Sequence, residues 1–186
     1  MDCILLENRS IALEKQVSGL GFTRSYFLDD MVVLTATDKK SLLLESKKAK
    51  KSGKIVMFKP QTEDMLRFAL DKTVVDAVFG IEGIHLKDHT HYVRGGLDQV
   101  LAKIAFDKKK VICFSFSSML NARDLGFVIA RMKLNLKLCK KYKVPMFFGM
   151  FNSVSELRSA SDLFALWQLI GGKSKETLKL PLVSSR

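Results

Sequence analysis

Hydrophobic residues along this chain fall into two alternating patterns: short apolar runs, and longer segments in which apolar and polar positions repeat. The short runs are rich in Val, Ile and Phe and almost continuous in hydrophobicity, which is typical of strands buried on both faces of a parallel sheet. They predict strands at Cys3–Leu6, Met31–Ala36, Ile55–Phe58, Asp76–Ile81, Val111–Phe116 and Pro145–Met150. Gly21–Leu28 is a candidate for a further short strand, so the pattern predicts about seven strands.

The segments between these runs have the spacing of amphipathic helices. Lys39–Lys51 follows Asp38, a favourable N-cap, and ends in lysines just before Gly53. Thr62 stands before two acidic residues, which favours another helix start. Further helices are predicted at Gly96–Asp107, Asp124–Tyr142 and Leu163–Ile170. Their apolar stripes indicate core faces rather than contacts to a cofactor.

Strands that alternate with helices through short connections predict an α/β fold with a parallel sheet. Two closures are open: a β/α barrel and an open doubly wound sheet. The sequence has no GxGxxG or phosphate-binding loop, which disfavours a dinucleotide-binding sheet. Seven strands are fewer than the usual eight of a barrel. The pattern alone does not choose between them, but the length fits one domain at 1–172 and a C-terminal tail at 173–186, expected to be the more flexible part.

The charge of the chain is unbalanced, because 31 Lys and Arg face 19 Asp and Glu and leave a net charge of +12. An excess of this size indicates an acidic partner such as RNA, DNA or an anionic membrane, although it is also compatible with a merely soluble basic protein. No signal peptide and no apolar run long enough for a spanning helix is found, so we expect a cytoplasmic protein without a membrane partner. Cys3, Cys113 and Cys139 lie among apolar neighbours, which predicts buried thiols.

Several cations follow predicted strands, and in a β/α barrel such positions lie on the C-terminal face, where function is normally placed. The lysine runs around positions 47–54, 108–110 and 137–143 precede strands and belong to the opposite face, where they also complement helix dipoles. No exposed aromatic ladder is evident, so binding through RNA shape and backbone is favoured over base stacking. The candidate RNA-binding residues are Lys54, Lys59, His91, Arg94, Arg123, Arg158 and Ser159.

Arg158 and Ser159 have a specific mechanism. If Ser159 caps the helix that contains Leu163–Ile170, the free N–H groups of the first turn and the guanidinium together form a phosphate site. The alternative is a surface salt bridge from Arg158 to Glu156 or Asp162.

Independent catalysis has little support in the sequence. His85, His89 and His91 share one loop, and no other histidine is available to complete a metal site. None of the common hydrolase, metalloprotease or nucleotide-binding motifs is present. We therefore predict no catalytic residue and no metal ligand. A free-standing metal-dependent phosphoesterase and a protein-binding scaffold remain as alternatives.

Four segments, in order, resemble a known family. They are HYVRGGLDQV at His91–Val100, VICFSFSSML at Val111–Leu120, NLKLCKKYKVP at Asn135–Pro145, and Glu156–Ser159 with the Leu-rich segment Leu163–Gly171. They resemble ribonuclease P protein component 3, the archaeal counterpart of the eukaryotic thirty-kilodalton subunit. Ala160, where the family favours Pro, and Phe151-Asn152, where it favours small residues, depart from its pattern.

The resemblance implies a barrel of the polymerase-and-histidinol-phosphatase type in which catalysis belongs to the RNA. The related phosphoesterases carry Asp-x-His-x-His near the first strand, where this chain has Asp2-Cys3-Ile4-Leu5-Leu6. The resemblance also implies binding to ribonuclease P RNA, pairing with ribonuclease P component 2 in a heterotetramer, other protein subunits of the enzyme, and indirect contact with precursor tRNA. No cofactor is expected on this chain, whereas the RNA is expected to need magnesium.

Overall fold

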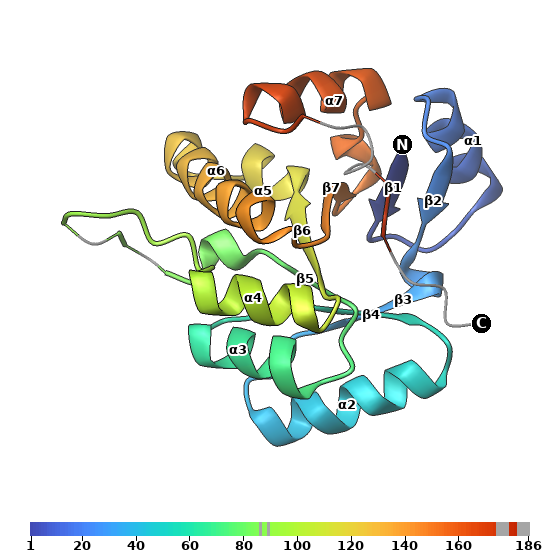
Figure 1. The fold of residues 1–186 in the computed structure, drawn as a ribbon. Helices are drawn as coiled ribbons and strands as arrows, with labels where there is room; N and C mark the ends of the chain where they lie inside the picture. Colours follow the sequence, from blue (N-terminus) through green and yellow to red (C-terminus); the bar gives the residue numbers. More distant parts are fainter. Residues whose placement is uncertain (86, 89, 174–178, 182–186) are drawn as a thin grey trace.

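The computed structural model describes residues 1–85, 87–88, 90–173 and 179–181, and its centre is a sheet of seven parallel strands (Figure 1). The strands are β1 (Asp2–Leu5), β2 (Arg24–Tyr26), β3 (Met31–Leu34), β4 (Ile55–Phe58), β5 (Ala77–Phe79), β6 (Val111–Ser115) and β7 (Met146–Phe151). The helices are α1 (Ile11–Gly19), α2 (Lys39–Lys51), α3 (Glu63–Lys72), α4 (Gln99–Asp107), α5 (Phe116–Leu120), α6 (Leu125–Tyr142) and α7 (Ala160–Leu169). Three 3₁₀ turns, η1 (Leu28–Asp30), η2 (Ile81–Gly83) and η3 (Val154–Glu156), complete the described elements.

The strands are arranged as a nearly closed barrel. Their order is β2-β1-β7-β6-β5-β4-β3. Strands that follow one another in sequence are therefore neighbours, except β2 and β3, which form the two ends of the sheet, and β1 also pairs with β7. The sheet curves so that the helices surround it (Figure 1). A doubly wound sheet would reverse its strand order at a switch point, and this order does not. The predicted β/α barrel of about seven strands is confirmed.

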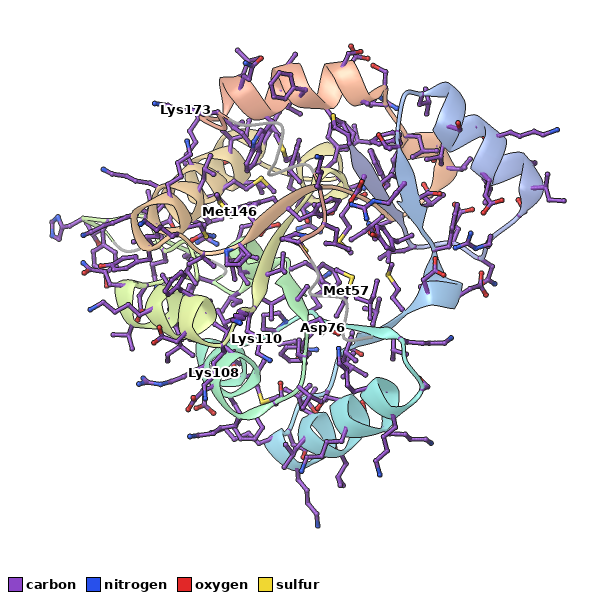
Figure 2. The ribbon with its side chains drawn as sticks, turned by 45° about the vertical axis from the view of Figure 1, so that its right-hand side comes forward. Met57, Asp76, Lys108, Lys110, Met146 and Lys173 are labelled. Carbon is purple, nitrogen blue, oxygen red and sulfur yellow. The ribbon has the colours of Figure 1, made fainter. Side chains whose placement is uncertain are left out.

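The barrel has one apolar core inside and a larger one between the strands and the helices. On β4, Met57 packs inside the barrel with Met31, Phe79 and Cys113, whereas Val56 and Phe58 pack outward against helices. Figure 2 shows Met57 among the encircling strands. Because successive side chains of a strand point to opposite faces, burial on both faces produces the continuous apolar runs seen in the sequence.

Most predicted helix starts are confirmed by their caps. The side chains of Asp38, Thr62 and Asp124 each accept a hydrogen bond from the backbone N–H three residues later. The start predicted at Gly96 is wrong by one turn, because Gly96 has a φ of +87° and Asp98 is the cap of α4. At this position a side chain would also meet the carbonyl oxygen of Ile81 at 2.3 Å.

Two short helices were not expected. Strand β6 ends at Ser115, one residue earlier than predicted, because the Ser115 hydroxyl caps α5. The segment that we interpreted as a serine-rich turn is therefore helical. Helix α1, capped by Ser10, has only Val17 fully buried, so its apolar periodicity is weak.

The chain returns to the barrel near its C-terminus. Leu180 is 5% exposed and packs with the residues inside the barrel, and its N–H donates to Oδ2 of Asp2 at 2.9 Å. Asp2 lies at the first residue of β1, so this contact is at the N-terminal end of the strands. Most of the predicted tail, at 174–178 and 182–186, lies outside the described residues.

Candidate nucleic-acid interface

A buried carboxylate organises the C-terminal face of the barrel. Glu156 in η3 accepts hydrogen bonds from the hydroxyl of Ser117, from Nδ2 of Asn121 at 2.6 Å and from the backbone N–H of Asn152 at 2.9 Å. Burial raises the pKa of the Glu156 carboxyl, but these hydrogen bonds outweigh it and hold the pKa below its ordinary value. The network joins α5 to the loop after β7 and fixes the backbone that carries Arg158.

Arg158 is exposed on this face and has no carboxylate partner among the described residues. Its Nη1 donates to the carbonyl of Leu157 at 2.8 Å, and its guanidinium lies 5.9 Å from the ring centroid of Phe116. The salt bridge considered as an alternative is not formed, because Glu156 is already occupied by other donors and no ion pair joins Arg158 to Asp162. The positive charge of Arg158 is therefore available to an outside anion.

Ser159 caps α7, as predicted. Its hydroxyl accepts the N–H of Asp162 at 3.1 Å and lies 2.8 Å from the hydroxyl of Ser161. The helix thus begins at Ala160, two residues after Arg158, which places its positive dipole end close to the guanidinium.

Lys59 follows β4 and borders a pocket on the same face, which we call the C-terminal pocket. Gly80 makes this possible because it adopts a φ of +69° and leaves room for the Lys59 stem, which would lie 3.3 Å from a side chain at this position. The pocket has a volume of about 280 Å³. Its lining consists of Lys59, Gly80, Glu82, Gly83, Ser117, Ser118, Asn121, Val128 and Asn152.

The loop that carries His91 and Arg94 extends beyond α4 and α6 (Figure 1). Its base is held by α6: buried Arg131 pairs with Asp88 at 2.6 Å. The backbone N–H of Arg94 donates to Oδ1 of Asp88 at 2.8 Å. The guanidinium of Arg94 has no partner among the described residues. His91 is exposed. The structure therefore separates these two candidates from the rest of the C-terminal face.

Arg123 lies in the exposed turn between α5 and α6, two residues after Asn121 of the C-terminal pocket. Lys59, Arg123 and Arg158 are thus gathered around α5. These three cations and the start of α7 form one basic surface, which we call the α5 surface.

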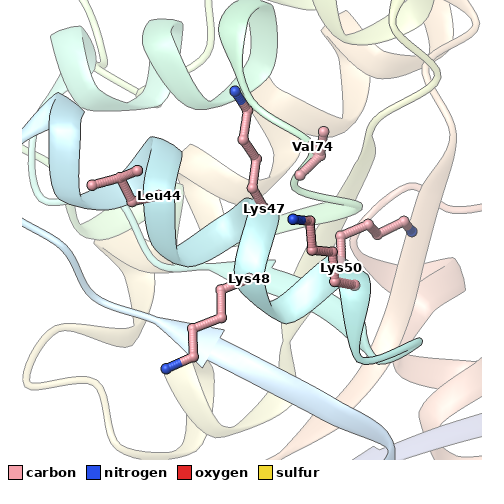
Figure 3. Close-up of a pocket in the computed structure, with 6 residues that line it drawn as sticks. Leu44, Lys47, Lys48, Lys50 and Val74 are labelled. Atoms are coloured by element: carbon pink, nitrogen blue, oxygen red, sulfur yellow. The ribbon is translucent and has the colours of Figure 1, made fainter.

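Lys54 is on the other side of the barrel. It precedes β4, at the N-terminal end of the strands, and borders a groove with Lys48 and Glu45 of α2. Beside it, the last turns of α2 and Val74 surround an open hollow of about 540 Å³, which we call the basic hollow (Figure 3). Its lining consists of Leu44, Lys47, Lys48, Lys50, Lys51 and Val74.

Some lysines at this end of the barrel form ion pairs or hydrogen bonds that stabilise the fold, whereas others do not. Lys50 pairs with Asp76 at 2.6 Å, and Lys110 donates to the carbonyls of Thr73 and Val75 at 2.9 and 2.7 Å. Asp76, Lys108 and Lys110 lie on the same side of the barrel in Figure 2. Within the described part of the chain, the ammonium groups of Lys47, Lys48 and Lys51 have no hydrogen bond or ion pair, and those of Lys47 and Lys48 point in different directions in Figure 3.

The part of the chain that the structure describes also indicates whether a metal could be bound. Across the described ranges, no group of three His, Cys, Asp or Glu side chains could hold a metal ion. His85 bonds Glu63 at 2.6 Å, and His89 lies outside the described residues. The three cysteines are buried, as predicted, and burial raises the pKa of Cys3 to about 12, which disfavours a thiolate.

None of the described helices combines the length and the apolar character that crossing a membrane requires.

Three residues on which this region depends were not predicted from the sequence. They are Glu82, Arg131 and Glu156, the last as the acceptor of hydrogen bonds that join α5 to the loop after β7. Arg131 interrupts the apolar stripe of α6 yet is fully buried, and a charged residue at a core position is a signal that we did not use. Glu82 lies in η2, three residues after the buried strand β5, at the end where barrel sites lie.

No family model matches the sequence, and no curated protein matches it. Solved structures do. The chain superposes over 92% of its length on 74% of a chain from the cryo-EM structure of archaeal ribonuclease P with mature tRNA, with a TM-score of 0.68 and 20% identity. It also matches the crystal structure of an uncharacterized protein, over 76% of this chain and 39% of that one, with a TM-score of 0.55 and 10% identity. These similarities show a shared fold.

Proposed function

We propose that this protein is an RNA-binding component of a ribonucleoprotein. More specifically, it is a protein subunit of ribonuclease P, which binds and organises the catalytic RNA for removal of the 5′ leader from precursor tRNA. The observation that carries the proposal is the similarity of nearly the whole chain to a chain of archaeal ribonuclease P with mature tRNA. The family resemblance found in the sequence segments supports the same complex by an independent route.

The charge distribution fits this role. The chain has a net charge of +12, and cations lie both on the α5 surface at one end of the barrel and around the basic hollow at the other, so the protein presents cations to RNA in two directions. Each phosphate that a lysine or arginine neutralises releases counterions and reduces the repulsion that opposes a compact RNA fold. We infer that the protein acts by lowering this repulsion, so that the RNA is active at a modest magnesium concentration.

The proposal includes the protein partners of such an enzyme. Ribonuclease P component 2 and further subunits would bind surfaces that the RNA leaves free, and precursor tRNA would be contacted through the RNA. Magnesium would belong to the RNA, because the described side chains offer no cluster of ligands for it. The reduced, buried cysteines suit a cytoplasmic site of action.

Reconstitution tests this function directly. An archaeal ribonuclease P RNA, transcribed in vitro, would be assayed for precursor tRNA cleavage with component 2 and the remaining subunits, with and without this chain. We expect the chain to increase cleavage at low magnesium and to leave the cleavage site unchanged. No effect on rate at any magnesium concentration, together with no RNA binding, would exclude the proposal.

Salt dependence gives a second measurement. If roughly 6–10 phosphates are contacted, the RNA affinity should fall by about 10³–10⁵-fold between 50 and 200 mM salt. Filter binding across this range measures the slope. An affinity that does not change with salt would contradict binding through the phosphate backbone.

A further inference from the structure

We propose that the basic hollow binds one unpaired nucleotide of RNA. The base lies against the side chains of Leu44 and Val74, which form the apolar floor of the hollow (Figure 3). The phosphates on either side of the base bind the ammonium groups of Lys47 and Lys51. The inference deepens the proposed function, on which it rests for RNA as the partner, because it names the kind of RNA feature that this end of the barrel binds.

The first argument is the apolar floor itself. Leu44 is 59% exposed and Val74 is 37% exposed, and they line the hollow from two different segments, α2 and the connection between α3 and β5. Single apolar side chains on a surface are common, whereas neighbouring ones that are rimmed by polar groups mark contact sites. A ligand that covers this floor must offer an apolar face as well as negative charge.

The exposure of Val74 is imposed by the fold. Lys110 donates to the carbonyls of Thr73 and Val75, at 2.9 and 2.7 Å, and so holds the residues on both sides of Val74. Thr73 and Val75 are themselves buried, and Val74 is left outside between them. Because this backbone is already held in place, a ligand that covers Val74 does not have to order it, which favours affinity.

The second argument is the charge around the floor. Among the described residues that line the hollow, all those with a charge are lysines. Lys50 is occupied by Asp76, whereas Lys47 and Lys51 have no hydrogen bond or ion pair within the described part of the chain. Cations in the last turn of a helix complement its dipole, but Lys47 lies before that turn in α2. Lys47 is therefore available to an anion and has no evident role in the fold.

The third argument is the arrangement of apolar and charged groups along α2. Leu44, Lys47 and Lys51 stand at i, i+3 and i+7, so they follow one another along one face of the helix. An unpaired nucleotide has a flat base face and phosphates on either side, which is the combination that this helix face and Val74 can cover. A fully paired RNA helix keeps the faces of its bases in the stack and would leave the floor without an apolar partner.

Substitutions at exposed positions separate the two kinds of contact. Leu44→Gln removes the apolar contact and keeps a residue that favours helix, whereas Val74→Thr keeps the shape and adds a hydroxyl. Lys47→Met and Lys51→Met each remove a cation and keep most of the stem. Lys15→Met is the matched control, since Lys15 is an exposed lysine of α1 without an ion pair among the described residues. Thermal unfolding of each variant checks that the fold is retained.

The affinity of each variant is measured for two RNA hairpins that are identical except for one bulged nucleotide. We expect the wild type to bind the bulged hairpin about fivefold more tightly, as for partial burial of apolar side chains. Leu44→Gln and Val74→Thr should reduce this preference and leave the affinity for the paired hairpin unchanged. Lys47→Met and Lys51→Met should each weaken the binding of both hairpins about tenfold, as for a lost charged hydrogen bond.

NMR titration locates the base on the protein. In the wild type, the bulged hairpin should shift the methyl signals of Leu44 and Val74 more strongly than the paired hairpin does. Lys15→Met should show the same shifts as the wild type and an affinity within about twofold of it.

Three results would overturn the inference. The first is equal affinity of the wild type for the two hairpins. The second is an undiminished preference for the bulged hairpin in Leu44→Gln, or methyl signals that move equally with both hairpins, since the hollow would then bind the backbone alone. The third is an acidic peptide with leucine residues that binds the hollow more tightly than the bulged hairpin does, which would assign it to a protein partner.

Failure of this inference and failure of the proposed function are distinguishable. Protein that stimulates ribonuclease P RNA but binds the two hairpins equally would contradict the unpaired-nucleotide site and leave the proposed function standing. Protein that discriminates between the hairpins through Leu44, but neither binds nor stimulates ribonuclease P RNA, would contradict the proposed function and support the site.

Discussion

Arg131 and Asp88 form an ion pair that attaches a surface loop to the core. Nη2 of Arg131 lies 2.6 Å from Oδ1 of Asp88, and the Arg131 side chain is fully buried. Its guanidinium also stacks on Phe127 at 3.7 Å from the ring centroid. With its remaining donors directed at two backbone carbonyls, this one side chain fixes the base of the loop that carries His91 and Arg94.

Replacing Arg131 with Met should therefore destabilise the protein. The change leaves Asp88 without its cation and the carbonyls of Glu82 and His85 without their donor, so we expect the free energy of unfolding to fall by about 3–5 kcal/mol. Urea denaturation measures this. Lys133→Met on the exposed side of the same helix is the control and should change it by less than about 0.5 kcal/mol. Equal stability of the two variants would show that the buried pair has no structural role.

Arg158→Ala should weaken RNA binding without unfolding the protein. Its guanidinium contacts only backbone carbonyls and the Phe116 ring, so the fold loses little, whereas a lost phosphate contact costs roughly 1–3 kcal/mol of affinity. Arg123→Ala should behave in the same way. Filter binding at fixed salt tests both, with Lys15→Ala as the charge-matched control. Unchanged affinity in both arginine variants would remove them from the RNA-binding surface.

Stability in acid should depend on Glu156. Its pKa is lower in the folded protein than in the unfolded chain, so the ionised carboxylate stabilises the fold above the unfolded pKa of about 4.3. This contribution should disappear as the pH falls from that value through the folded pKa. Glu156→Gln should be less stable at pH 7 and should show a weaker decline below pH 4.3. A variant with the same acid profile as the wild type would contradict this role.

Leu180 should contribute to stability although it lies close to the C-terminus. It is 5% exposed among residues inside the barrel, so Leu180→Ala should lower the free energy of unfolding by about 2–3 kcal/mol, near the lower end for buried leucines. Thermal unfolding measures the loss. Lys179→Ala, at the exposed neighbour, should have almost no effect. If both variants unfold like the wild type, the contact between Leu180 and the barrel does not stabilise the fold.

The elements of this fold were predictable because their signals are local. Buried strands such as Ile55–Phe58 are marked by continuous apolar runs, and helix starts are marked by caps such as Asp38 and Asp124. A cap and its partner are three residues apart, so the sequence contains both. The cations that follow strands were placed correctly for the same reason, because a parallel strand order puts all those ends on one face.

The sequence by itself thus determined the order of strands and helices, the excess of positive charge, and the end of the barrel on which Lys59, Arg123 and Arg158 lie. Only the tertiary structure decided how the sheet closes, which lysines are occupied by partners, and that Glu82 and Arg131 are buried. The physical reason is distance along the chain. Lys50 pairs with Asp76, which is 26 residues away in sequence, and Asp88 pairs with Arg131, which is 43 residues away. Such pairings arise from packing between elements, and no local pattern of residues specifies them.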